Sequence, residues 1–343
     1  MFKKSSIIYL FSVLIIVFLA LQSCNDNGKE TNGDSKGNAD LIIKDDKGEK
    51  VNLKLRPEVG DTLRYKMVAN TLSDEKSPAT KDQDLHTEQL MTYYYTQEVT
   101  EISEAGVITY KMKYDSIRIE SKVSAKDSTI SEVYNSNVED SIHALPDFIQ
   151  YNALIGEYFK LRVSDLGEVY DAYELENIHE KIFKALGDTL TPQEKATIKE
   201  SMGADAIKSI IQNQYQKFPE NEIYKDSSWT FTSETSLLIF PIKNLLSYKL
   251  LDIKEEGGNY ILTIDAALGI EFISKEQNEK DLTIKLTNSN TGGKGTVFFN
   301  LSRGCIVKKE TRTNIELDMK LSAQGQSANS LQKLTTSLTV ELL

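Results

Sequence analysis

Apolar and polar residues alternate with a period of two along most of this chain. Successive side chains of a β-strand point to opposite faces, so this period is typical of half-buried antiparallel strands. In residues 313–322, for example, Ile315, Leu317, Met319 and Leu321 share one face. The pattern predicts strands in residues 51–55, 62–69, 90–102, 107–121, 158–173, 228–240, 245–274, 281–287, 295–312, 313–322 and 331–343. Together they predict a mainly β fold, a large antiparallel curved or barrel-like sheet with one wet face.

Short polar stretches separate the predicted strands. Hairpin turns are expected at Ser103–Gly106, Asp165–Gly167 and Glu256–Asn259, and a polar loop at 323–330. The stretch Gly-Gly-Lys-Gly-Thr (292–296) also suits a turn. It lacks the earlier Gly of a phosphate-binding loop and precedes a strand rather than a helix, so it does not indicate nucleotide binding.

Residues 173–218 change to helical spacing and predict two or three helices. Leu175, Ile178, Ile182 and Leu186 form the first apolar stripe, and Ile198 and Met202 belong to the second. Thr191-Pro192-Gln193-Glu194 is a capping box with Pro at the first helical position. A third stripe runs from Ile207 through Tyr215 to Phe218 and stops at Pro219. We expect these stripes to lie on the sheet; the alternative is a lid over a ligand.

The strand pattern of the first half is echoed in the second. The hairpins at 99–112 and 158–171 correspond, in the same order, to those at 250–264 and 295–308. This predicts a duplicated β unit, with repeats 50–172 and 225–343 joined by the helical segment 173–218.

Residues 1–23 have the three parts of a bacterial signal peptide. Lys3 and Lys4 precede an apolar core at 7–20, which is shorter than the ~20 residues that span a bilayer. Leu21-Gln22-Ser23-Cys24 resembles the lipobox of bacterial lipoproteins, and that resemblance implies acylation of Cys24 and cleavage before it. The alternatives are an ordinary secretory signal in which Cys24 is incidental, or a transmembrane anchor.

Residues 24–40 are almost entirely polar and predict a flexible tether, which leaves 41–343 as the β-rich domain. A lipid on Cys24 would anchor the chain to a membrane of the cell envelope. We expect the outer membrane, with the periplasmic and surface faces left open.

The charge and the cysteine count narrow the function further. The net charge is −11 and removal of the signal makes it more negative, which disfavours nucleic-acid binding. Cys305 is the only other cysteine, so no intrachain disulfide is predicted after lipidation. Its strand-like surroundings indicate a buried apolar role, although nearby cationic residues leave a reactive thiol as the alternative.

No catalytic or metal-binding motif stands out. His86, His143 and His179 lack ligand spacing to other His or Cys residues, and no Gly-x-Ser-x-Gly elbow occurs. No metal or cofactor is therefore predicted, and we expect a protein that is not an enzyme.

Two groups of residues could still form surfaces. Tyr93 and Tyr95 should share a face opposite Tyr94, with Tyr110 and Tyr114 one hairpin arm away. Core packing is the expectation for them, and an apolar or glycan-binding surface the alternative. Four Asp-Ser/Thr-apolar triplets resemble a Bacteroidota O-glycosylation signal, and they begin at Asp61, Asp115, Asp140 and Asp188.

Several stretches resemble a family of uncharacterised Bacteroidota envelope lipoproteins that carries a domain of unknown function. They are residues 56–65 (RPEVGDTLRY), the turn at 103–106, 160–167 (KLRVSDLG) and Phe218-Pro219 followed by 225–229 (KDSSW). Lys225 replaces the Gly that is usual in the family, and the resemblance covers about residues 50–343. It implies the compartment and the fold and adds no site residue.

The tether, the one-faced strands and the amphipathic helices together favour a non-enzymatic binding protein for an apolar ligand, such as a lipid or a lipoprotein. The alternatives are a structural or accessory subunit that binds another envelope protein or a glycan, and, third, an envelope hydrolase.

Overall fold

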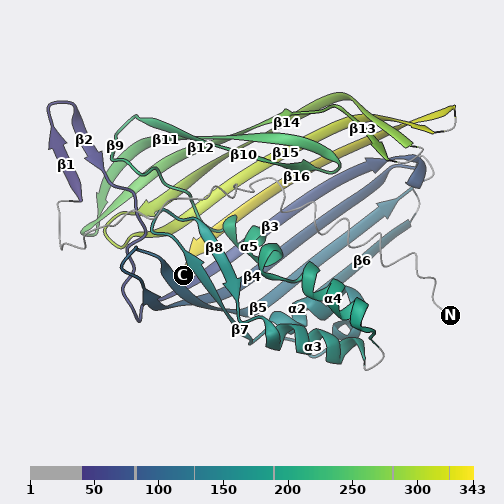
Figure 1. The fold of residues 1–343 in the computed structure, drawn as a ribbon, viewed down its shortest axis with the longest axis horizontal. Coiled ribbons are helices and arrows are strands. Elements are labelled where there is room, and N and C mark those ends of the chain that lie inside the picture. The colour runs from purple at the N-terminus through teal and green to yellow at the C-terminus, as the bar shows by residue number, and fades with distance from the viewer. Residues whose placement is uncertain (1–40, 81–82, 127, 188–189, 280–281, 324) are drawn as a thin grey trace.

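A computed structural model of the chain describes residues 41–343 except 81–82, 127, 188–189, 280–281 and 324. It contains an antiparallel sheet of 13 strands (Figure 1), so the prediction of a mainly β fold with inserted helices is confirmed. The strands of this sheet are β3 (Thr62–Lys76), β4 (Leu85–Ile102), β5 (Ile108–Ala125), β6 (Ser128–Asn135), β7 (Tyr158–Val163), β8 (Val169–Tyr173), β10 (Ser228–Leu237), β11 (Phe240–Glu256), β12 (Asn259–Phe272), β13 (Glu276–Glu279), β14 (Leu282–Asn300), β15 (Cys305–Ala323) and β16 (Gln326–Leu342).

The order of the strands joins the two halves of the chain at the middle of the sheet. The path is β10-β11-β12-β14-β15-β16-β3-β4-β5-β7-β8, with β6 on β5 and β13 on β14. The last strand, β16, pairs with the first long strand, β3, so that Leu342 lies opposite Tyr65. The sheet is open, since its path ends at β10 and β8. The strands of each half follow one another in sequence order, which is compatible with a duplicated unit; the duplication and the domain boundaries stay predictions.

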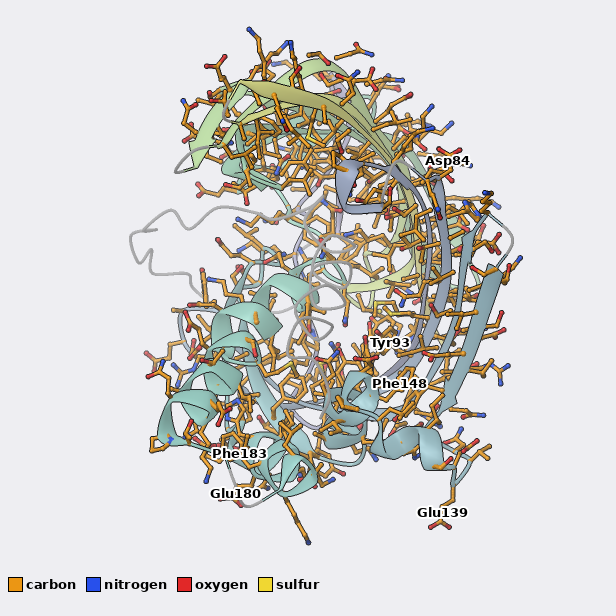
Figure 2. The ribbon with its side chains drawn as sticks, turned by 90° about the vertical axis from the view of Figure 1, so that its right-hand side faces the viewer. Asp84, Tyr93, Glu139, Phe148, Glu180 and Phe183 are labelled. Carbon is orange, nitrogen blue, oxygen red and sulfur yellow. The ribbon has the colours of Figure 1, made fainter. Side chains whose placement is uncertain are left out.

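One face of the sheet is concave and carries the core. Figure 2 shows the curved wall with side chains filling its inner side, and Tyr93 and Phe148 are among them. Both residues belong to the main apolar cluster. A second, smaller cluster lies further along the C-terminal half and includes Ile242, Leu286 and Leu317.

Alternation located most of the long strands, but it missed β6 and β13 and misassigned several other stretches. Residues 52–55 lie outside any strand, because β2 ends at Val51. The predicted loop at 323–330 is mostly strand, since β16 already begins at Gln326. The stretch 292–296 is not a turn and lies inside β14.

The glycines of this stretch allow β14 and the neighbouring strands to approach one another closely. A Cβ on Gly295 would lie 2.5 Å from the carbonyl oxygen of Glu310 on β15. Glycine inside a strand marks such sites as well as turns, and residue types alone do not distinguish the two.

Four α-helices are described: α2 (Pro146–Leu154), α3 (Glu176–Leu186), α4 (Pro192–Ser201) and α5 (Ala204–Gln212). The last three confirm the predicted helical segment, whereas α2 was missed because its apolar residues, among them Phe148, Ile149 and Tyr151, do not gather on one helical face. Figure 1 shows the helices gathered beside the N-terminal half of the sheet. Within the described residues, no helix is long and apolar enough to cross a membrane.

The predicted capping box of α4 is present. The Thr191 side chain accepts a hydrogen bond from the backbone N–H of Glu194, whose carboxylate accepts one from the backbone N–H of Thr191. Ile178 and Ile182 of α3 are buried, as their stripe predicted. The stripe on α4 was overestimated, because Ile198 is only partly buried and no described residue of α4 is fully buried.

A separate three-stranded sheet is formed by β1 (Ile42–Asp45), β2 (Gly48–Val51) and β9 (Ile223–Tyr224). It brings residues from the start of the domain against the segment that follows the helices, because Val51 pairs with Ile223.

Candidate functional site

Residues 212–218, Gln-Asn-Gln-Tyr-Gln-Lys-Phe, form a polar segment that runs through the interior, and we call it the inner segment. All of its residues except Lys217 are buried. The third helical stripe was predicted to continue through Tyr215 to Phe218, but α5 ends at Gln212. Buried amides require hydrogen-bond partners, and tertiary contacts supply several of them.

The inner segment is held on one side by the edge of the N-terminal half of the sheet. The Gln212 side chain accepts from the Val169 backbone N–H at 2.7 Å and donates to the Gly167 carbonyl at 3.1 Å. The backbone N–H of Phe218 donates to the Leu166 carbonyl. The approach is so close that a Cβ on Gly167 would lie 2.0 Å from the carbonyl oxygen of Gln216. Gly167 also has a positive φ of 80°, so glycine is required here for two reasons.

On its other side the inner segment meets Lys309, which points inward from β15. The Lys309 Nζ donates to the carbonyl oxygens of Asn213 at 3.0 Å and of Tyr215 at 2.7 Å. These carbonyls follow the C-terminus of α5, where a cation is favourable. The side chain is 5 % exposed, and burial lowers the pKa of Lys309 to about 8.

A cavity of about 40 Å³ lies beside Lys309, between the inner segment and the concave face of β11, β12, β14 and β15. Its floor is made of small residues. Gly293 and Gly295 share the strand face of buried Val297. Gly295 pairs with Ala266 on β12 and with Thr311 on β15, and all three line the cavity. The space exists because successive inward positions carry little or no side chain.

The walls of this cavity combine apolar and cationic groups. Leu246, Tyr248 and Leu268 supply the apolar surface, and Lys217 and Lys309 the cations, whereas the side chain of Lys294 lies on the outer face of β14. No Asp or Glu is among the described lining residues. The arrangement suits an apolar group that carries a negative charge.

A second cavity, of about 20 Å³, lies on the other side of the inner segment among buried tyrosines. Tyr65, Tyr95, Tyr110 and Tyr215 line it, together with Gln97, Gln214 and Cys305. Burial raises the pKa of Tyr65, Tyr95 and Tyr215 well above the usual value of a phenol. These hydroxyls are neutral near pH 7, and that of Tyr65 donates to the Ile306 carbonyl.

The tyrosine prediction is confirmed in its core-packing form. Tyr93 and Tyr95 face inward and are buried, whereas Tyr94 lies on the other face with the Lys66 ammonium 5.8 Å from its ring centre. Tyr95 stacks on Tyr65, with ring centres 5.5 Å apart. These rings form core contacts rather than an exposed glycan-binding surface.

Cys305 is buried, as its surroundings predicted. Burial raises the pKa of its thiol, against a smaller opposing effect of the Arg303 charge. The thiolate is therefore disfavoured, and a reactive role does not fit this position.

The three histidines lie apart and make different contacts. The two ring nitrogens of His86 contact carboxylates of Asp74 and Glu88 at 2.6 and 3.0 Å, which raises its pKa. The Nε2 of His143 lies 3.1 Å from the Asn135 carbonyl, and that of His179 lies 3.0 Å from the Met202 carbonyl. In the part of the chain that the structure describes, no group of three His, Cys, Asp or Glu could hold a metal ion.

The other sequence candidates fall in different places. Thr62 and Ser141 of the glycosylation-like triplets are exposed, and Ser116 is half-buried. The triplet at 188–190 begins outside the described residues, and Cys24 also lies outside them. The lipidation of Cys24, the signal peptide and the tether therefore stay predictions.

Sequence reasoning missed Lys309, although a signal was present. Counting back in steps of two from Ile315 and Leu317 places Thr313, Thr311 and Lys309 on the same inward face. The apolar stripe pointed to Tyr215 and Phe218, but the buried amides of the inner segment left no such trace, because their burial depends on contacts with the segment 166–169 and with β15.

A family model matches residues 105–306, from the turn before β5 to the start of β15, and its description is "Family of unknown function (DUF6263)". The chain belongs to this family. Membership confirms the predicted domain of unknown function; the Bacteroidota origin and the lipoprotein character stay predictions. No curated protein matches the chain.

Among solved structures, the chain is similar to one described as "Lipid-protein interactions in lipovitellin". The TM-score is 0.41 with 11% identity, over 84% of this chain and 25% of the other, so the chain spans about a quarter of the lipovitellin chain. It also matches OccK7 (OpdD) of Pseudomonas aeruginosa, with a TM-score of 0.23 and 7% identity over 83% of this chain and 99% of that one. The transport unit of the autotransporter AIDA-I from Escherichia coli gives a TM-score of 0.22 and 10% identity over the whole of both chains. Likenesses this distant say nothing about function.

Proposed function

We propose that the protein is a non-enzymatic lipoprotein of the bacterial envelope that binds an apolar ligand, a lipid or an acyl chain of a lipoprotein, against the concave face of β11, β12, β14 and β15. The observation that carries the proposal is the small-residue floor at Ala266, Gly293 and Gly295 under an apolar wall. No side chain on this floor is larger than a methyl group, so none of the three residues fills the space above it.

Binding requires more room than the cavity now has. About 40 Å³ is well below the roughly 300–1,000 Å³ of ordinary ligand pockets. The ligand would therefore extend along the inward positions of β12 that continue from Ala266 to Leu268 and Ile270, of which Ala266 and Ile270 are half-buried and Leu268 is buried. Ile270 packs against both apolar clusters, so this strip of positions connects them.

Native mass spectrometry tests the proposal. The whole chain with Cys24→Ala is expressed in its host, purified without detergent and sprayed intact. We expect a bound apolar molecule that collisional activation releases. A protein that carries no such molecule and takes up no added lipid would contradict the proposal.

A pair of variants localises the ligand. Ala266→Leu places a branched four-carbon side chain on the cavity floor and should lower the ligand-bound fraction. Ser247→Leu places the same side chain on the exposed face of β11 and should leave that fraction unchanged. Equal occupancy in both variants would contradict binding at this floor.

A second candidate function is an accessory subunit that binds another envelope protein. It is favoured by β6, which pairs with β5 alone in the described sheet and exposes Ile130 (65 %) and Val133 (47 %). Exposed apolar residues on an edge strand suit pairing with a partner. A protein that co-purifies with the wild type and is lost from Ile130→Lys, without any bound lipid, would favour this candidate.

A further inference from the structure

The charges around the larger cavity indicate the chemical class of the apolar ligand. This inference rests on the proposed function. Two lysines, Lys217 and Lys309, bring positive charge to the cavity, and only Lys217 has its charge matched by a carboxylate in the described structure. The Lys217 ammonium lies 2.9 Å from a Glu168 carboxylate oxygen. Lys309 makes its described hydrogen bonds only to backbone carbonyls, which are neutral.

Lys309 has capacity for a further acceptor. An ammonium carries three donors, and the two carbonyl contacts account for two of them. The side chain lines the cavity, so an acceptor within the cavity can meet the third. Burying a charge without a counter-charge is costly, and an incoming anion would offset much of that cost.

The cavity is large enough for a charged head group but too small for an acyl chain. A space of about 40 Å³ holds a few water-sized groups, which is enough for a carboxylate and too little for an acyl chain. The apolar strip from Leu268 to Ile270 begins at the cavity and leads to the second cluster. A charged group beside Lys309 with a chain along this strip would satisfy both environments.

We infer that the ligand is an anionic amphiphile, whose carboxylate or phosphate group contacts the ammonium of Lys309 while its alkyl chain lies along the concave strip of β12. The Lys309 ammonium, which donates to the carbonyls that follow α5, also contacts the anion in this arrangement.

Calorimetric titration of the whole chain with Cys24→Ala tests this inference with ligands of one chain length. The probes are dodecanoate, dodecyl phosphate and the neutral dodecanamide, with acetate and inorganic phosphate as chain-free anions. We expect both dodecyl anions to bind at least tenfold more tightly than dodecanamide, and the chain-free anions to bind at least a hundredfold more weakly.

Variants of two adjacent lysines provide the matched control. Lys309→Met should weaken the dodecyl anions at least tenfold and leave dodecanamide unchanged, and Lys309→Arg should restore part of the preference. Lys308→Met should change neither, because Lys308 is partly exposed and pairs with Glu310 at 3.0 Å. The comparison of the probes on the protein that keeps Lys309 does not depend on whether the Lys309 variants fold.

The outcomes separate the two proposals. Equal binding of dodecanoate and dodecanamide would overturn the anion preference while leaving the apolar-ligand function in place. Inorganic phosphate binding as tightly as dodecyl phosphate would overturn the amphiphile and indicate a small-anion site. Failure of every dodecyl compound to bind would overturn the proposed function itself.

Discussion

Lys309 makes stability depend on pH in a direction set by its burial. Its pKa in the folded protein is about 8, below the 10.5 of an exposed lysine. Near pH 7 the amine is protonated in both states, and burying the charge disfavours the fold. Between about pH 8 and 10.5 the unfolded chain holds a proton that the folded chain has lost. The free energy of unfolding should therefore rise with pH, by at most about 1.4 kcal/mol per pH unit.

Urea unfolding of the wild type and of Lys309→Met, compared from pH 7 to 9.5, checks this. The variant should lack the rise, whatever its absolute stability, while the Lys308→Met control keeps it. Groups common to all three proteins cancel in the difference. Parallel pH profiles for the wild type and Lys309→Met would show that Lys309 is not desolvated.

At the scale of single elements, β14 depends on glycine in the middle of a 19-residue strand. Gly295→Ala would bring a Cβ to 2.5 Å from the Glu310 carbonyl and 2.7 Å from the Thr311 methyl. The strands would have to separate, and we expect a loss of about 2 kcal/mol in the free energy of unfolding, as for other overpacked sites.

Gly269→Ala on β12 is the matched control, because the nearest atom to its added Cβ is the Leu245 Cβ at 3.6 Å, an ordinary contact. Its effect should stay within about 0.5 kcal/mol. Chemical denaturation of both variants gives the comparison, and equal losses would mean that the contact with β15 does not require glycine.

The elements also show where periodicity works. The alternation in residues 90–102 of β4 and 331–342 of β16 was read correctly because buried inward positions recur there between more exposed ones. It failed at 292–296, where glycines removed the apolar signal from inward positions. It failed again at 212–218, where polar residues are buried by contacts that no local pattern encodes.

At the scale of the whole molecule, the predicted lipid on Cys24 would hold the domain at a membrane through the segment 24–40. Two or more acyl chains give stable attachment, because each buried CH₂ contributes roughly 0.8 kcal/mol. Cys24→Ala should move the protein from the membrane fraction to the soluble fraction, as followed by immunoblotting after a carbonate wash.

Cys305→Ala is the control for that experiment, since this second cysteine is buried in the core. It should leave the protein in the membrane fraction. If Cys24→Ala stayed with the membrane as well, attachment through this residue would be refuted.

The sequence by itself determined the fold class, most strands, the three helices of 173–218 and the core position of Tyr93 and Tyr95. Each of these follows from side-chain period or capping chemistry, which act over a few residues. Only the tertiary structure decided that β16 closes against β3, that the inner segment is buried, and that Lys309 meets Asn213 across 96 residues of chain. The candidate site is built from such long-range contacts, because a cavity arises from how distant strands and segments pack and not from any single stretch of sequence.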